Sequence, residues 1–361
     1  MGVTPAAWAA DGPKPGAYPT VEVKIPIEIQ ADRFYGTQDD TDRHDVFAKI
    51  EPEVVVRFGG GFSIEAGLTL EEVVDPDPAS ENRVFEDEGL YIETLKANYE
   101  YGRFAVFGGK FTADFGIAHK GEVLPGIYSR DMAEDYELTE RVGVGGTAML
   151  ADGDMGKHAL SAGVFYLDTT SFSKSAFRNR GRRRPTGGGP SNTESLKSFT
   201  VALEGENVAG VKDLHYHLSG ARQGVDRVND EDGVAKAGSA TDDETGFAAA
   251  VHYRFAVGKV GVAPVVEWVR LNDFGGDTGV DRTYVTAGLG AELDQWNAAL
   301  AWTRRHTDNP SSADAHDYQL QVSAGYRFKS GIGVEVGWKQ SKESELLSRT
   351  VGALLTYEYA F

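Results

Sequence analysis

The chain has 361 residues, no cysteine, 44 glycines and a formal net charge of −19 at pH 7. Without cysteine it cannot form disulfides, Cys-type zinc sites or a thiol nucleophile, so only His, Asp and Glu could bind a metal. No apolar run approaches the roughly twenty residues that a transmembrane helix needs. A membrane β-barrel is not excluded, because its strands place apolar residues only at alternate positions.

The first residues resemble the end of a signal peptide. Ala7-Trp8-Ala9 fits the small-x-small cleavage rule, although the basic and long apolar regions that should precede it are missing. We therefore expect residues 1–9 to be a residual signal-peptide segment and residues 10–361 to form a single transmembrane β-barrel domain. The alternative is the flexible N-terminus of a soluble protein.

Alternation of apolar and polar residues predicts β-strands along most of the chain. The first strand shows it clearly, with apolar residues at odd positions from Val21 to Ile29 and mainly polar residues between them. The expected strands, in chain order, are 21–29, 46–58, 62–71, 90–99, 104–111, 142–150, 159–167, 196–204, 214–221, 247–255, 260–268, 283–292, 296–302, 318–328, 332–338 and 351–361. The sequence thus predicts an all-β protein of about sixteen antiparallel strands.

The connections between these strands alternate in length. Those after odd-numbered strands are mostly long and polar, whereas those after even-numbered strands are short, as at Gly59-Gly60-Gly61 and Tyr101-Gly102-Arg103. Aromatic residues gather beside the short turns, as in the interfacial girdle of a membrane barrel. We expect short periplasmic turns, long extracellular loops and both termini on the periplasmic side.

The apolar face of such a barrel must meet either a packed core or lipid. Sixteen strands enclose a lumen too wide for side chains to fill, so the apolar set should face outward and the charged set should line water. A soluble β-sandwich or propeller is the alternative fold.

The strand plan resembles the trimeric general porins of Gram-negative outer membranes. The last strand ends in TYEYAF, and its Tyr357, Tyr359 and Phe361 are similar to the signal read by the barrel-assembly machinery. The stretch GGKFTADFG (108–116) is also similar to the entry of the third loop in phosphate-selective porins. The resemblance implies a homotrimer in the bacterial outer membrane, in contact with lipid and lipopolysaccharide.

The third long connection, residues 112–140, stands where general porins fold a loop into the lumen. If it folds inward, it presents an acidic constriction made of Asp114, Glu122, Asp131, Glu134, Asp135, Glu137 and Glu140. The basic barrel-wall candidates opposite are Lys24, Lys49, Arg57 and Lys96. Opposite charges across a narrow pore would create a transverse field that favours dipolar solutes. The alternative is an outward loop with solvated charges.

The densest positive feature is the run from Arg178 to Arg184. Because it falls in an external loop, lipopolysaccharide phosphates, a neighbouring acidic loop or the pore mouth are more natural partners than nucleic acid. A mobile solvated loop is the alternative.

No cofactor or dedicated metal site is expected. Asn229-Asp230-Glu231-Asp232-Gly233 fails the EF-hand pattern, so acidic loops offer at most weak calcium binding. His215 and His217 share one face of a strand, but no third ligand is identifiable, which favours histidines that line the lumen. We find no GxSxG, HExxH or P-loop motif, so no catalytic residue is predicted.

The sequence therefore predicts a porin for passive diffusion of small hydrophilic solutes and ions, with a weak cation preference. An anion-, phosphate- or sugar-selective porin is the first alternative. A barrel enzyme with a plugged lumen is the second.

Overall fold

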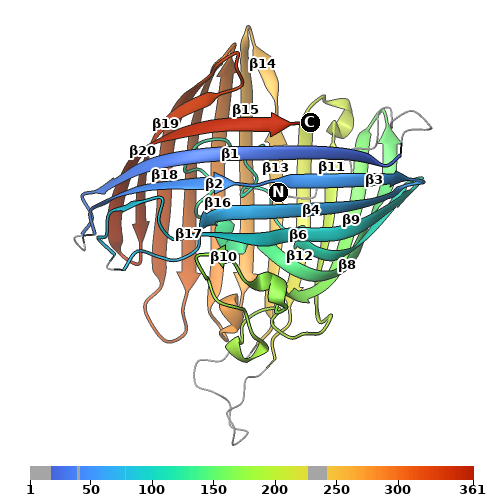
Figure 1. The fold of residues 1–361 in the computed structure, drawn as a ribbon, viewed down its shortest axis with the longest axis horizontal. Helices are drawn as coiled ribbons and strands as arrows, with labels where there is room; N and C mark the ends of the chain where they lie inside the picture. The colour runs from blue at the N-terminus through green and yellow to red at the C-terminus, as the bar shows by residue number, and fades with distance from the viewer. Residues whose placement is uncertain (1–17, 39–40, 78, 227–241) are drawn as a thin grey trace, which may run out of the picture.

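The structure is a computed structural model that describes residues 18–38, 41–77, 79–226 and 242–361. The expected signal-peptide segment 1–9 and the acidic stretch 229–233 lie outside the described residues. The described chain forms one large antiparallel β-sheet that closes on itself (Figure 1). In the part of the chain described, no helix has the length and apolar character needed to cross a membrane.

Sixteen strands make up the barrel wall, in the order that the sequence predicts. They are β1 (Thr20–Tyr35), β2 with β3 (Arg43–Ile50 and Glu53–Gly59), β4 (Phe62–Glu72), β6 (Glu88–Tyr101), β7 (Phe104–Ala113), β8 (Leu138–Gly153), β9 (Gly156–Leu167), β11 (Ser198–Glu206), β12 (Leu214–Gln223), β13 with β14 (Glu244–Tyr253 and Phe255–Val257), β15 (Val260–Asn272), β16 (Asp281–Leu293), β17 (Trp296–Asp308), β18 (Ala315–Arg327), β19 (Gly333–Glu343) and β20 (Leu346–Ala360). The two-residue strands β5 (Arg83–Val84) and β10 (Ala176–Phe177) lie in connecting loops. The second wall strand is broken at Pro52, which has no N–H to donate to a neighbour.

The last strand closes the barrel against the first. β1 and β20 are antiparallel neighbours with Ile27 opposite Tyr357, and they lie side by side in Figure 1. Phe361 extends this pairing, because its backbone N–H donates to Val23 O at 3.1 Å and its carbonyl accepts from Val23 N at 2.9 Å. Closure leaves no unpaired sheet edge, which a barrel in lipid requires.

The exterior of the barrel is apolar because alternate residues of each strand point outward. The exposed large apolar side chains include Val21, Ile29, Val266, Leu300, Val322 and Val351. Aromatic side chains are exposed beside the short turns, among them Phe58, Phe62, Tyr99, Phe104, Trp296 and Phe328. An apolar band flanked by an aromatic girdle is the exterior of a membrane barrel.

This assignment of faces predicts opposite outcomes for two neighbouring substitutions on β1. Ile29→Arg puts a charge on the lipid face and should lower the free energy of unfolding by about 2–4 kcal/mol. Gln30→Arg, which places the same side chain on the lumen side, should leave this free energy nearly unchanged. Denaturant unfolding in lipid vesicles measures both, and equal losses would contradict the assignment.

Candidate functional site

The third long connection, residues 114–137 between β7 and β8, folds into the barrel. Its side chains are buried as in a protein core: Phe115, Leu124, Tyr128, Met132 and Tyr136 are each at most 2% exposed. A loop on the outer surface would leave such residues in water. We call residues 114–137 the inner loop.

The inner loop is attached to one side of the barrel by apolar contacts. Phe115, Leu124 and Tyr136 belong to a buried cluster that also contains inward-facing residues of four wall strands, namely Ala248, Ala250, Val265, Val269, Leu271, Tyr284 and Ala301. The expectation that the inward-facing set is charged and lines water therefore does not hold where the inner loop covers β13, β15, β16 and β17. Their inner face is largely apolar there, because the inner loop covers it and excludes water, and buried polar groups such as Glu267 are bonded to the loop.

Two glycines in the wall allow this close approach. A Cβ atom on Gly288 would lie 2.1 Å from Leu124 Cδ1, and one on Gly337 would lie 2.1 Å from Ile127 Cγ2. Any side chain at these positions would push the inner loop away from the wall. The inner loop thus packs closely against the wall at two separate strands, β16 and β19.

Glu267 on β15 holds the start and the end of the inner loop together. Its carboxylate accepts hydrogen bonds from Ile117 N at 2.5 Å, Ala118 N at 3.0 Å and Tyr136 OH at 2.5 Å. Glu267 is 1% exposed. A buried carboxylate is stable here because three donors replace its water.

Removing this carboxylate should release the inner loop. Glu267→Ala leaves buried donors unpaired at about 1–3 kcal/mol each. We expect limited proteolysis of the folded variant to cut within residues 114–137, where the wild-type protein resists. Glu292→Ala, at an exposed position on β16, is the matched control. Equal protease resistance of Glu267→Ala and wild type would contradict this role.

The middle of the inner loop reaches the opposite part of the wall. Tyr128 donates its hydroxyl to Asp32 of β1 at 2.6 Å, and Ile127 N donates to Glu335 of β19 at 2.9 Å. Asp131 forms an ion pair with Lys339 of β19 at 2.6 Å. The inner loop therefore spans the lumen from β15 to the β1 and β19 side, which narrows the passage beside it.

A cavity of about 1270 Å³ remains between the inner loop and the wall. The wall strands around it include β1, β2, β4, β19 and β20. Among the described residues, twelve carboxylate side chains and eight basic side chains line it, a formal difference of −4. The passage is thus polar and, on balance, acidic.

Three of the seven predicted acidic residues line this cavity, namely Glu122, Asp131 and Glu134. The other four point elsewhere and are paired with basic groups: Asp114 with Lys120 at 3.5 Å, Asp135 with Arg305 at 2.7 Å, Glu137 with His119 at 3.4 Å, and Glu140 with Lys110 at 2.7 Å. Glu140 belongs to β8 rather than to the loop. Three residues of the predicted acidic set thus line the cavity, whereas Asp114, Asp135 and Glu137 are in ion pairs of the inner loop and Glu140 is in an ion pair outside it.

The His119 pair keeps Glu137 charged. Burial alone would raise the pKa of Glu137, but its interaction with the His119 side chain lowers this pKa to about 2. Glu137 is thus ionised at neutral pH, which suits its place in an ion pair at the end of the inner loop.

The predicted basic wall is corrected in a similar way. Only Lys49 of the four candidates lies among the described residues that line the cavity. Arg57 pairs with Glu22 at 3.1 Å and Lys96 with Glu65 at 3.2 Å, while Lys24 lies near the short-turn end of β1. Arg57 and Lys96 are thus held in ion pairs between neighbouring strands, which strand periodicity alone does not reveal.

The other basic residues that line the cavity are Arg43, Arg83, Arg130, Lys212, Arg254, Arg327 and Lys339. Sequence reasoning missed five of them, namely Arg43, Arg83, Lys212, Arg254 and Arg327. Arg43 has the same phase as Lys49 in β2, so the alternation could have identified it. Arg130 and Arg254 depend on how the inner loop folds, for which the sequence carries no signal.

The charges do not separate into an acidic loop and a basic wall. Burial would lower the pKa of Arg130 on the inner loop, but the carboxylates of Glu134, Glu28 and Glu51 raise it. Glu28 is on β1 and Glu51 lies between β2 and β3. Arg130 of the inner loop therefore faces an acidic stretch of the wall. Acidic and basic side chains thus occur on both the inner loop and the wall, instead of the acidic loop and basic wall that the predicted transverse field requires.

The Arg178–Arg184 run folds back onto the barrel. Arg180 pairs with Glu140 at 2.7 Å, Arg183 with Glu140 at 3.5 Å, and Arg178 with Asp87 at 2.9 Å. Of the partners considered from the sequence, a neighbouring acidic loop and the barrel mouth thus supply the observed contacts. The run anchors the connection 168–197 at the long-loop end.

The residues of the predicted assembly signal lie on the outer face at the short-turn end. Tyr357, Tyr359 and Phe361 are exposed, and the rings of Tyr359 and Phe361 are 5.5 Å apart. Their recognition by the assembly machinery remains a prediction. Deleting Phe361 should lower the yield of folded barrel in membranes, whereas Phe104→Ala, in the girdle beside another turn, should not. Heat-modifiable gel migration measures the folded fraction, and equal yields would contradict the role.

The closed wall, the apolar exterior and the inner loop define a sixteen-stranded membrane β-barrel with a loop folded into its lumen. No family model and no curated protein matches the sequence. Solved structures with a similar fold include OprB of Pseudomonas putida, with a TM-score of 0.63 and 9% identity over 94% of this chain and 94% of that chain. The outer membrane channel DcaP of Acinetobacter baumannii has a TM-score of 0.61 and 14% identity over 94% and 97%. OmpT of Vibrio cholerae, an outer membrane protein described in a trimer form, has a TM-score of 0.54 and 10% identity over 94% and 100%.

Proposed function

We propose that this protein is a diffusion channel for small hydrophilic solutes and ions across the bacterial outer membrane. The observation that carries the proposal is the cavity of about 1270 Å³ beside the inner loop, with its polar and charged lining. Such a lining replaces part of the hydration of a polar solute, whereas an apolar solute gains nothing from it. The similarity to a barrel described as a channel supports a transport role rather than a catalytic one.

We further propose a weak preference for cations. Twelve carboxylates against eight basic groups make the cavity lining acidic among the described residues. Each basic group can neutralise one carboxylate, as between Lys339 and Asp131 at 2.6 Å and between Arg83 and Asp45 at 2.6 Å. An excess of four carboxylates remains among twenty charged groups, so the preference should be modest.

The zero-current potential across a planar bilayer with a KCl gradient tests both parts of this proposal. A potential of the sign set by K⁺ movement is the expected result. A potential of the opposite sign would overturn the cation preference and favour an anion-selective channel. Absence of conductance from correctly folded barrels would overturn the channel itself and favour a plugged lumen.

We also propose that three copies of the chain associate in the membrane. The support is the fold shared with OmpT of Vibrio cholerae, which is described in a trimer form. Light scattering of the detergent-solubilised protein measures the mass directly, and a monomeric mass would contradict the assembly. Contact with lipopolysaccharide remains a prediction.

A further inference from the structure

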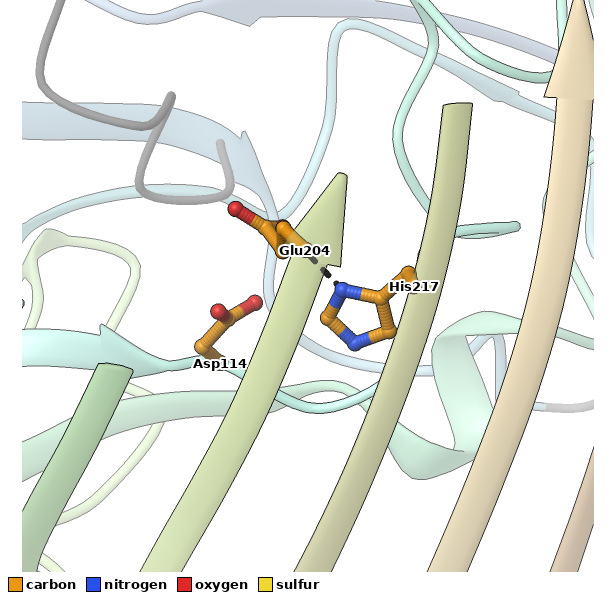
Figure 2. Close-up of side chains that lie close together, drawn as sticks. All are labelled: Asp114, Glu204 and His217. Atoms are coloured by element: carbon orange, nitrogen blue, oxygen red, sulfur yellow. Dashed lines mark hydrogen bonds and ion pairs between the residues drawn. The ribbon is translucent and has the colours of Figure 1, made fainter. Parts of the chain in front are cut away.

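A cluster of potential metal ligands lies inside the barrel where the inner loop begins. Asp114 follows β7, Glu204 is on β11 and His217 is on β12, and one ligand atom from each lies within 4.8 Å of the others (Figure 2). Glu204 and His217 are directly opposite each other in the β11–β12 ladder. The register of the sheet therefore fixes two of the three groups, and the loop brings the third.

The cluster is buried and incompletely hydrogen-bonded. The side chain of His217 is 2% exposed and that of Asp114 is 8% exposed. Asp114 Oδ1 is a buried atom without a close hydrogen-bond partner, because the nearest donor, the ammonium of Lys120, lies 3.5 Å away. Figure 2 shows the Asp114 carboxylate directed toward Glu204 and His217. A buried acceptor without a hydrogen bond is costly, and a bound cation would satisfy it.

Lys120 is the cationic group next to this cluster. Its ammonium forms a long ion pair with Asp114 Oδ1 at 3.5 Å, and its side chain is 7% exposed. One ammonium offsets only half of the charge of two carboxylates. A divalent ion would balance both carboxylates, so Lys120 and such an ion would compete for Asp114 Oδ1.

The ligand types of the cluster match zinc better than calcium or magnesium. His217 Nδ1 and Glu204 Oε1 are hydrogen-bonded at 3.0 Å. Two ligand atoms that each lie about 2.0–2.1 Å from a tetrahedral zinc are roughly 3.3 Å apart, so a zinc ion would replace this hydrogen bond with only a small shift of the two side chains. An imidazole with two carboxylates is a zinc ligand set, whereas calcium and magnesium prefer oxygen ligands alone.

We propose that Asp114, Glu204 and His217 bind one Zn²⁺ ion, and that the ion displaces the ammonium of Lys120. The ion would attach the start of the inner loop to the β11–β12 wall. A second group of three residues, His306, Asp308 and Asp314, also meets the distance criterion for a metal. It is more exposed, and Asp308 already pairs with Arg270 at 3.1 Å, so it serves as the control.

Calorimetric titration of the full chain with ZnCl₂ tests the proposal. The protein is folded in detergent, treated with EDTA, and titrated in excess Ca²⁺ and Mg²⁺ so that weak acidic sites are occupied. We expect one equivalent of zinc to bind. His217→Ala and Glu204→Gln should each weaken binding by about 100-fold or more. His306→Ala should bind zinc like wild type.

For Lys120→Ala we expect zinc affinity to rise, in contrast to the loss of affinity expected for His217→Ala and Glu204→Gln. Removing the competing ammonium should tighten zinc binding on the order of tenfold, since it frees Asp114 Oδ1. An unchanged affinity in this variant would overturn the displacement of Lys120. A general loss of fold could not produce tighter binding.

The site itself is overturned by either of two results. The first is zinc binding that His217→Ala leaves unchanged, and the second is absence of binding in both wild type and Lys120→Ala. Heat-modifiable migration checks that each variant is folded. If His217→Ala does not fold, Asp114→Asn replaces it, because Asp114 lies outside the strand ladder and keeps its shape in the variant.

Discussion

Replacing residues 116–135 with a short Gly/Ser linker is expected to raise the single-channel conductance well above that of wild type. The inner loop fills the lumen between β15 and the β1 and β19 side, so its removal widens the narrowest passage. A short linker suffices because the strands that flank the inner loop are paired at its base, with Ala113 opposite Leu138 in the β7–β8 ladder. The barrel should still close, since the β1–β20 ladder does not involve the inner loop.

The same variant should be less stable than wild type. Each large apolar side chain lost from the buried cluster removes about 1.5–3 kcal/mol of burial. Replacing the exposed connection 309–314 by a linker is the matched control and should change neither conductance nor stability. Wild-type conductance in the inner-loop variant would contradict the assignment of this loop as the constriction.

Reversing three charges of the cavity lining should reverse the ion preference. Glu28, Glu122 and Glu134 line the passage, and their replacement by Lys changes the formal difference of the lining from −4 to +2. One nearby unit charge is worth on the order of 1 kcal/mol to a passing ion even in water. We therefore expect the zero-current potential in a KCl gradient to change sign in this triple Lys variant.

A series of variants distinguishes the effect of the charge of the cavity lining from the effect of the net charge of the protein. The triple Gln variant at the same positions should give an intermediate potential, close to no preference. Glu86→Lys, Asp154→Lys and Asp294→Lys together make the same change in net charge at exposed positions outside the cavity lining. Their potential should equal that of wild type, and an equal shift in both triple Lys variants would contradict the role of the lining.

The number and order of the strands could be predicted from the sequence because the alternation of apolar and polar residues is a local property of each strand. Lipid outside and water inside impose opposite polarity on successive residues, as at Ile29 and Gln30, and this needs no knowledge of distant contacts. The pairing of Phe361 with Val23 follows from the same pattern once the barrel is closed. Strand order and count were therefore predictable.

The constriction was only partly accessible, because it depends on contacts between distant segments. Nothing near Glu267 in the sequence indicates that it accepts hydrogen bonds from Ile117 and Ala118. Residue type suggested Lys24 and Lys96 as wall cations, but neither of them lines the cavity beside the inner loop. His217 lacked a third ligand in the sequence, since Asp114 reaches it only through the fold of the inner loop.

If a water-filled passage runs beside the inner loop, a water-soluble reagent should reach a cysteine introduced on the lining of that passage but not one on the lipid face. Because the chain has no cysteine, Glu28→Cys and Ile29→Cys each provide one thiol, the first on the lumen side and the second on the lipid side of β1. A charged, water-soluble methanethiosulfonate added to a conducting bilayer should reduce the current of Glu28→Cys and leave that of Ile29→Cys unchanged. An unaffected Glu28→Cys current, or no current from folded barrels of either variant, would contradict the passage.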